Sequence, residues 1–100
     1  MKSTQEYVSM LKQHASELRE QFGIKAMRLF GSVAMGEQKE GSDIDLFVEM
    51  APDMYNIVAA HQYLEDLLGC DVDLIRNHRN IRPFFLEQIN KYGITIFSAA

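Results

Sequence analysis

The chain has 100 residues, of which 47% are hydrophobic and 24% are charged, a composition typical of a soluble globular protein. Its formal net charge of -4 disfavours a nucleic acid as the main partner, because non-specific binding to phosphates depends on Lys and Arg. No apolar run reaches the roughly 20 residues of a membrane span, and the N-terminus lacks the apolar stretch of a signal peptide. The single cysteine, Cys70, favours a reducing cytoplasm. We find no repeat or linker and predict one domain, residues 1–100.

The first third of the chain predicts a helix followed by a strand. Ser3 and Glu6 have the spacing of a capping box, and apolar residues then recur every three or four positions up to Phe22. Gly23 is placed to end this helix, and residues 26–30 are predicted to form a short apolar strand. Residues 31–42 hold three glycines among polar residues, which predicts turns with a short helical turn starting at Ser32.

The remaining chain alternates between strands and helices. Residues 43–50, 71–75 and 94–97 predict strands, whereas residues 54–68 and 81–92 predict helices that end at glycines. Pro83 is tolerated in the first turn of the last helix. This order of elements implies a sheet that helices cover on at least one face.

Two carboxylates share one face of the strand predicted at residues 43–50. Asp43 and Asp45 are two residues apart, so their Cα atoms lie roughly 6.6–6.8 Å apart. Carboxylates at that spacing can converge on two metal ions held about 3.5–4 Å apart, the geometry of two-metal nucleotidyl transfer. A divalent cation such as Mg²⁺ would relieve their repulsion. The pair taken alone is equally typical of the start of a surface strand.

A glycine–serine turn precedes this pair. Gly31 and Ser32 follow a predicted strand, and glycine lets the backbone approach a phosphate closely. The free N–H groups at the start of a helix favour an anion, and the serine hydroxyl adds a donor. Without further context, the same two residues are also typical of an ordinary turn.

Together these segments match a known signature. Gly31-Ser32, ten intervening residues, and Asp43-Ile44-Asp45 resemble the Gly-Ser-x10-Asp-x-Asp signature of the DNA polymerase beta-like nucleotidyltransferase superfamily. The string GSVAMGEQKEGSDIDLFV is similar to that of the small bacterial MNT proteins, and the context of Asp73 fits their third acid. The resemblance covers nearly the whole chain. It implies an α/β (α+β) nucleotidyltransferase fold, with a mixed central sheet of about four strands flanked by about three helices.

The resemblance also assigns roles. It implies two Mg²⁺ ions and ATP as the nucleotide donor. The implied catalytic and metal-binding residues are Asp43, Asp45 and Asp73, and the implied nucleotide-binding residues are Gly31, Ser32 and Ser42. Asp71 competes with Asp73, since both have the same strand parity. We prefer Asp73 because it lies deeper in the strand, where a charge costs more and points to a function.

The resemblance further implies an antitoxin of a HEPN/MNT pair, which transfers AMP from ATP to a tyrosine of its HEPN toxin partner in a hetero-oligomer. We expect another protein to complete the acceptor site.

One departure from the family pattern is Met35, where the family usually has an arginine that binds phosphate bidentately. Either Lys39 compensates, or nucleotide binding is weaker, or activity is lost. The alternatives are therefore an inactive domain that masks its toxin by binding, or a transferase acting on a small molecule such as an aminoglycoside. Three arginines follow or end the third predicted strand, namely Arg76, Arg79 and Arg82. They could bind the phosphates, contact an acidic partner or be plain surface residues.

Overall fold

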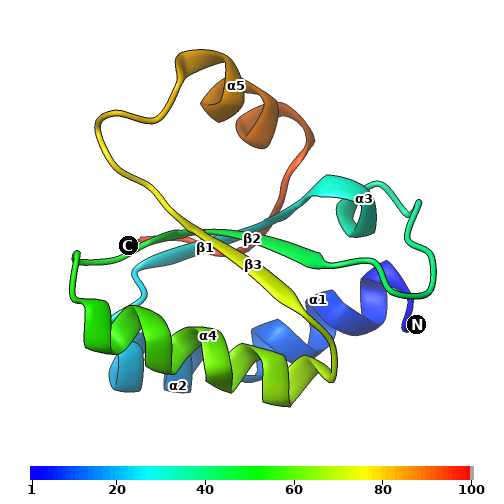
Figure 1. Cartoon of the computed structure of the whole chain (residues 1–100), viewed down its shortest axis with the longest axis horizontal. Helices are drawn as coiled ribbons and strands as arrows, with labels where there is room; N and C mark the ends of the chain where they lie inside the picture. The colour runs from blue at the N-terminus through cyan, green and yellow to red at the C-terminus, as the bar shows by residue number, and fades with distance from the viewer. Residues whose placement is uncertain (100) are drawn as a thin grey trace.

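The computed structural model describes residues 1–99 and contains one four-stranded sheet, with the strand order β3-β2-β1-β4 (Figure 1). The strands are β1 (Ala26–Phe30), β2 (Ile44–Glu49), β3 (Val72–Arg76) and β4 (Ile94–Phe97). Strand β1 is antiparallel to β2 and to β4, and β2 is parallel to β3. The expected mixed sheet is therefore confirmed, with every strand at or within one residue of its predicted bounds.

The helices are divided unequally between the two faces of the sheet. Helices α1 (Thr4–Gln13), α2 (Ala15–Phe22) and α4 (Met54–Leu68) lie on one face, and α5 (Pro83–Tyr92) lies over the other (Figure 1). The single turn α3 (Gly31–Ala34) follows directly on β1. Within residues 1–99, none of these helices combines the length and apolar character that crossing a membrane requires.

The prediction of one continuous first helix is wrong, because the chain bends at His14. The His14 ring pairs through Nδ1 with the carbonyl oxygen of Met10 at 2.8 Å, and its backbone N–H turns to Leu11 instead. A side chain that takes over a helical carbonyl in this way interrupts the helix. This break and the single turn α3 account for five helices in residues 1–99 where about three were expected.

Alternation along β2 separates an apolar face from a polar one. Ile44, Leu46 and Val48 have no exposed surface and pack in one cluster with residues of α1, α2 and α4, among them Leu64. Each such side chain stabilises the fold by about 1.5–3 kcal/mol. The opposite parity of β2 faces α5, where the ring of Phe47 lies 6.3 Å from the ring of α5's Phe85. The residues that alternate with the core therefore lie under α5.

Helix α4 fixes the edge strand β3 through its side chains. His61 Nε2 pairs with the carbonyl oxygen of Val72 at 2.7 Å, and the Val72 N–H donates to Glu65 at 3.0 Å. These bonds satisfy backbone groups that an edge strand would otherwise leave unpaired. His61 therefore helps to hold the strand that carries Asp73.

Candidate functional site

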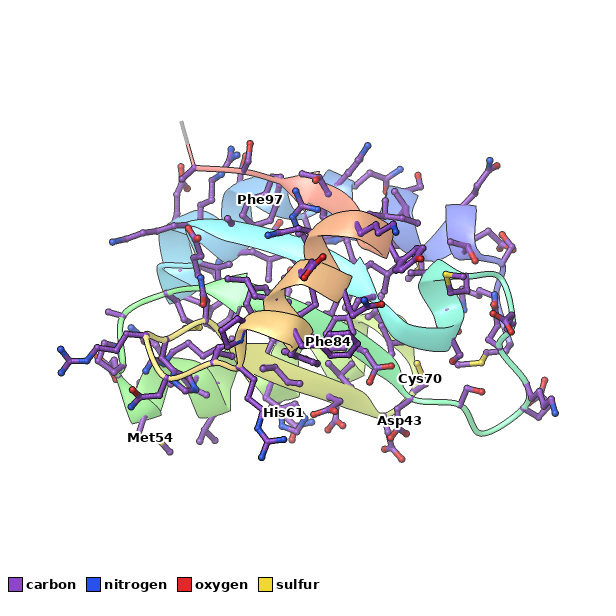
Figure 2. All side chains as sticks on the ribbon, turned by 90° about the horizontal axis from the view of Figure 1, so that it is seen from above. Asp43, Met54, His61, Cys70, Phe84 and Phe97 are labelled. Carbon is purple, nitrogen blue, oxygen red and sulfur yellow. The ribbon has the colours of Figure 1, made fainter. Side chains whose placement is uncertain are left out.

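The carboxylates of the predicted site gather where three strands meet at one end of the sheet. Because β2 and β3 run parallel, Asp45 and Asp73 are direct partners in register, and strands so paired lie about 4.8 Å apart. The antiparallel register of β1 places Phe30, the residue before Gly31, opposite Asp45. Asp43 is exposed immediately before β2 begins, at the end of the molecule seen in Figure 2. The structure thus brings Asp45 and Asp73 side by side and leaves Asp43 at their margin.

Asp45 experiences the charges of the other two carboxylates. Its partial burial raises the pKa of the carboxyl above its usual value, and the negative charges of Asp73 and then Asp43 raise this pKa further. Both causes disfavour the ionised form. A cation bound here would oppose them, so the electrostatics fit a site for a positive ion.

Gly31 is required by two independent features of its position. Its φ is +74°, in the left-handed region that favours glycine, and a Cβ there would overlap the carboxylate of Asp45. Ser32 follows it in the first turn of α3, where backbone N–H groups have no partner within the helix. The predicted phosphate-binding turn therefore lies directly against the predicted metal-binding carboxylate.

Ser42 has a structural role in the loop before β2. Its hydroxyl accepts a hydrogen bond from the backbone N–H of Lys39 at 2.9 Å, and its own N–H donates to the Lys39 carbonyl at 2.9 Å. These two bonds close the turn that leads to Asp43. Nucleotide binding by Ser42 stays a prediction.

The structure favours Asp73 over Asp71, but for a different reason from the one that we expected. We expected Asp73 to be the more buried of the two, yet both side chains are exposed. What distinguishes Asp73 is its register opposite Asp45, whereas Asp71 precedes β3 and contributes its carbonyl oxygen to the N–H of Ile44. The position of the neighbouring strand, rather than burial, places Asp73 beside Asp45.

Arg76 lies away from the carboxylates. Arg76 ends β3, at the opposite end of the strand from its N-terminal acids, and its guanidinium donates to the carbonyl oxygens of Met50 and Asn77 at 3.3 and 3.2 Å. This arrangement favours the structural reading of Arg76 over a role as a phosphate ligand. Arg79 and Arg82 are exposed on the segment between β3 and α5.

The fit to Mg²⁺ rests on the chemistry of the donors. Among residues 1–99, no three His, Cys, Asp or Glu side chains already form a group that could hold a metal ion. Mg²⁺ does not require such a cage, since it commonly keeps several waters and binds one or two carboxylates together with substrate phosphates. The adjacent carboxylates of Asp45 and Asp73, with Asp43 beside them, supply oxygen donors of that kind.

An apolar recess that sequence reasoning missed lies beside Gly31. It has a volume of about 380 Å³ and opens between α3 and α5. The residues that line it are Phe30, Gly31, Met35, Phe85, Gln88, Ile89 and Tyr92. The seven-residue spacing of Phe85 and Tyr92, which places both on one helical face, was the available signal. Nothing local in the sequence shows which face of the sheet that helix covers.

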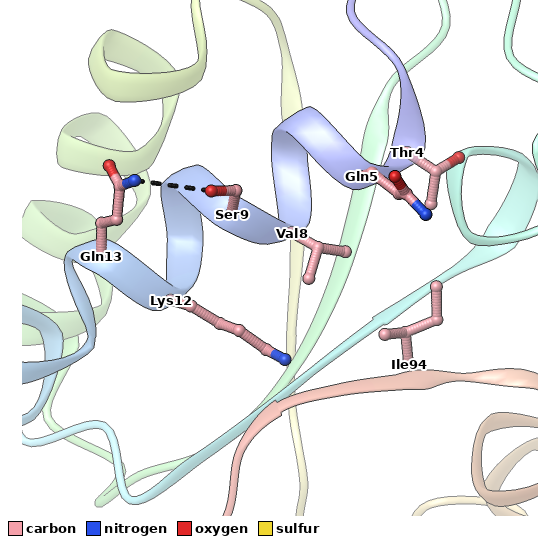
Figure 3. Close-up of a pocket in the computed structure, with 7 residues that line it drawn as sticks. All are labelled: Thr4, Gln5, Val8, Ser9, Lys12, Gln13 and Ile94. Atoms are coloured by element: carbon pink, nitrogen blue, oxygen red, sulfur yellow. Dashed lines mark hydrogen bonds between the residues drawn. The ribbon is translucent and has the colours of Figure 1, made fainter.

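A second depression, between α1 and β4, has a different character (Figure 3). Its lining includes Thr4, Val8, Lys12 and Ile94, and the lining residues include neither a carboxylate nor a glycine. It therefore offers no carboxylate to a metal ion and no glycine at which a phosphate could approach the backbone closely. The end of the sheet that carries Asp45 remains the candidate site.

Comparison with known proteins identifies the family of the chain. The family model described as polymerase beta, nucleotidyltransferase matches residues 12–100. Protein adenylyltransferase MntA of Thermococcus cleftensis is 43% identical over 77 residues, which cover 75% of this chain and 78% of that protein. A candidate protein adenylyltransferase of Methanocaldococcus jannaschii is 44% identical over 77 residues, covering 75% of this chain and 90% of that protein. The crystal structure of a toxin–antitoxin with AMP-PNP is similar with a TM-score of 0.69 and 26% identity, over 88% of this chain and 73% of that chain.

Proposed function

Because the chain belongs to the polymerase beta nucleotidyltransferase family, we propose that it transfers AMP from ATP to a tyrosine hydroxyl of a HEPN-type toxin. In doing so it acts as the antitoxin of that toxin, in a hetero-oligomer. The observation that carries the proposal is the pairing of Asp45 with Asp73 against Gly31. The name of the Thermococcus relative supports a protein as the acceptor, and the similar toxin–antitoxin structure supports the pairing with a toxin and an ATP analogue as ligand.

Each residue of the site has a defined task in this reaction. Asp43 and Asp45 would hold the Mg²⁺ ions, and Asp73 would complete the second of the two ion sites. When bound, Mg²⁺ neutralises charge that develops on the entering and leaving oxygens. The backbone N–H groups at Gly31 and Ser32 bind the β- and γ-phosphates, because the start of a helix favours an anion.

The transfer balances as a displacement at the α-phosphorus. The acceptor's hydroxyl oxygen forms a bond to that phosphorus, and the bond from phosphorus to the oxygen bridging to the β-phosphate breaks. Pyrophosphate leaves with the electrons of that bond. The hydroxyl proton passes to Asp73, whose exposed carboxylate then releases it to solvent. We place the reaction in the cytoplasm, which the lone Cys70 favours.

Intact mass spectrometry of the partner tests the proposal. The chain is incubated with ATP, Mg²⁺ and the purified HEPN toxin, and the toxin is expected to gain the mass of one or more AMP groups. Asp45→Asn is expected to prevent this gain. A stable complex without any gain in mass would overturn the transferase assignment.

A second candidate function is neutralisation by binding alone. Met35 favours it, because a thioether cannot bind phosphate oxygens as the family's usual arginine does. In that case the toxin is inhibited in the complex without ATP, and Asp45→Asn neutralises it as well as the wild type does. Ribonuclease assays of the complex with and without ATP separate the two functions.

A further inference from the structure

We propose that the recess between α3 and α5 binds the adenine base of the nucleotide donor, with Tyr92 as a stacking surface and Gln88 as its hydrogen-bonding partner. This inference rests on the proposed function, since it names the part of the site that recognises the nucleoside. It assigns a role to side chains of α5 that the carboxylate site does not use.

Gly31 belongs both to the carboxylate site and to the recess, so the two lie side by side. One side of Gly31 lies against the carboxylate of Asp45, and the same residue lines the recess. A nucleotide whose phosphates lie over Gly31 and Ser32 therefore has the recess as the adjoining space for its nucleoside. The volume of about 380 Å³ is within the range of ligand-binding pockets.

The lining of the recess suits a flat, neutral group. None of the described residues that line it is charged, so it offers nothing to a phosphate group. Met35, at the position of the family's usual arginine, is 54% exposed and lines this recess. The substitution that weakens the case for phosphate binding thus adds an apolar contact on the nucleoside side. Methionine is well suited to pack against an aromatic ring.

Two aromatic side chains give the recess one fixed wall and one open wall. Phe85 is held in place, since its ring meets those of Phe30 and Phe47 at centroid distances of 5.6 and 6.3 Å. Tyr92 is 50% exposed, so it has surface left for a ligand. Lys91 Nζ lies 5.4 Å from the centroid of the Tyr92 ring, where its positive charge also favours an anionic nucleotide nearby.

Gln88 makes a base a better occupant than the tyrosine ring of the acceptor. Its amide offers both donors and an acceptor, and a glutamine amide can pair bidentately with the edge of adenine. A tyrosine ring offers no such edge to an amide in the wall of an apolar pocket. The acceptor's tyrosine remains the rival occupant, and binding of a nucleotide in the absence of an acceptor distinguishes it from the adenine base.

Binding measurements without transfer test the proposal. Calorimetry compares AMP-PNP with tripolyphosphate, both with Mg²⁺, on the full chain and on two variants. Tyr92→Ala is expected to weaken binding of AMP-PNP by about tenfold or more, the scale of losing one base–aromatic stack, and to leave binding of tripolyphosphate unchanged. Phe84→Ala is the matched control, because Phe84 is a 72% exposed aromatic residue of α5 that does not line the recess (Figure 2).

Several outcomes would overturn the inference. The wild-type chain could bind AMP-PNP no more tightly than tripolyphosphate, or Tyr92→Ala could weaken both ligands equally. A Tyr92→Ala variant that binds AMP-PNP normally but loses transfer would assign the recess to the acceptor. By contrast, a chain that shows the expected binding pattern but modifies no toxin keeps the adenine site and refutes only the proposed transfer.

Discussion

Asp45→Asn is expected to stabilise the protein in the absence of divalent ions while abolishing its response to Mg²⁺. The pKa of Asp45 is raised by its partial burial and by Asp73 and Asp43, so its ionised form is disfavoured in the folded state. The stability linked to its protonated form is fully present below the unfolded pKa and is lost as the pH rises through the folded pKa. At neutral pH the charge is therefore a cost, and asparagine removes it with nearly the same shape.

The size of the effect follows from the register of the strands. Asp45 and Asp73 are paired on neighbouring strands about 4.8 Å apart, and two unit charges at roughly that distance repel by about 1 kcal/mol in water. The solvent-screened value applies because Asp73 is exposed. For a domain of about 60–100 residues, 1 kcal/mol corresponds to a rise in Tm of about 4–8 °C. Mg²⁺ at ten times its Kd would stabilise the wild type by about 1.4 kcal/mol.

Thermal unfolding followed by circular dichroism measures both effects. The wild type, Asp45→Asn and the control Asp66→Asn are compared in EDTA and in Mg²⁺, at neutral and at acidic pH. Asp66 is an exposed carboxylate of α4 that accepts a hydrogen bond from Gln62, so its substitution should change neither quantity appreciably. An Asp45→Asn variant that is no more stable than the wild type in EDTA, or that responds equally to Mg²⁺, would refute the electrostatic reasoning.

Three other substitutions test the remaining parts of the site. Asp73→Asn should lower AMP transfer by about 100-fold or more while Asp71→Asn stays within about twofold, and equal losses in a transfer assay would contradict the register argument. Gly31→Ala should lower the free energy of unfolding in urea by more than Gly36→Ala does. Both glycines have a positive φ (about +70°), but of the two only Gly31 has a carboxylate where the added Cβ would lie. Equal losses of stability in the two variants would speak against that contact. Met35→Arg should tighten the binding of tripolyphosphate with Mg²⁺ by about fivefold, although it removes an apolar contact on the nucleoside side, and unchanged binding would show that the position does not meet the phosphates.

The strands and the carboxylate face could be predicted because both follow from local alternation. In β2 the side chains of Ile44 and Leu46 must point away from that of Asp45, whatever the rest of the chain does. The glycine–serine turn was predictable for a similar reason. Gly31 ends an apolar strand and begins a polar segment with three glycines, and its left-handed φ agrees with the turn expected there.

The remainder depends on contacts that the spacing of apolar residues does not encode. The break at His14 arises from its bond to a backbone carbonyl, a bond that no apolar periodicity encodes. The pairing of Asp45 with Asp73 depends on β3 lying parallel to β2. Burial does not distinguish Asp73 as we predicted, because its side chain is exposed. The recess depends on α5 lying over the carboxylate face, which the pattern of α5 alone does not specify.

The unequal covering of the two faces explains how the fold tolerates like charges at the site. The face under α1, α2 and α4 buries Leu18, Leu46 and Leu64 completely, at about 1.5–3 kcal/mol for each side chain. A repulsion of about 1 kcal/mol at Asp45 is small beside that contribution. A further helix over the carboxylates would raise the cost of their charge steeply, because desolvation of an ion grows with burial. With α5 alone over this face, the exposed Asp43 and Asp73 stay hydrated, and space remains beside Gly31 where we propose that the nucleotide binds.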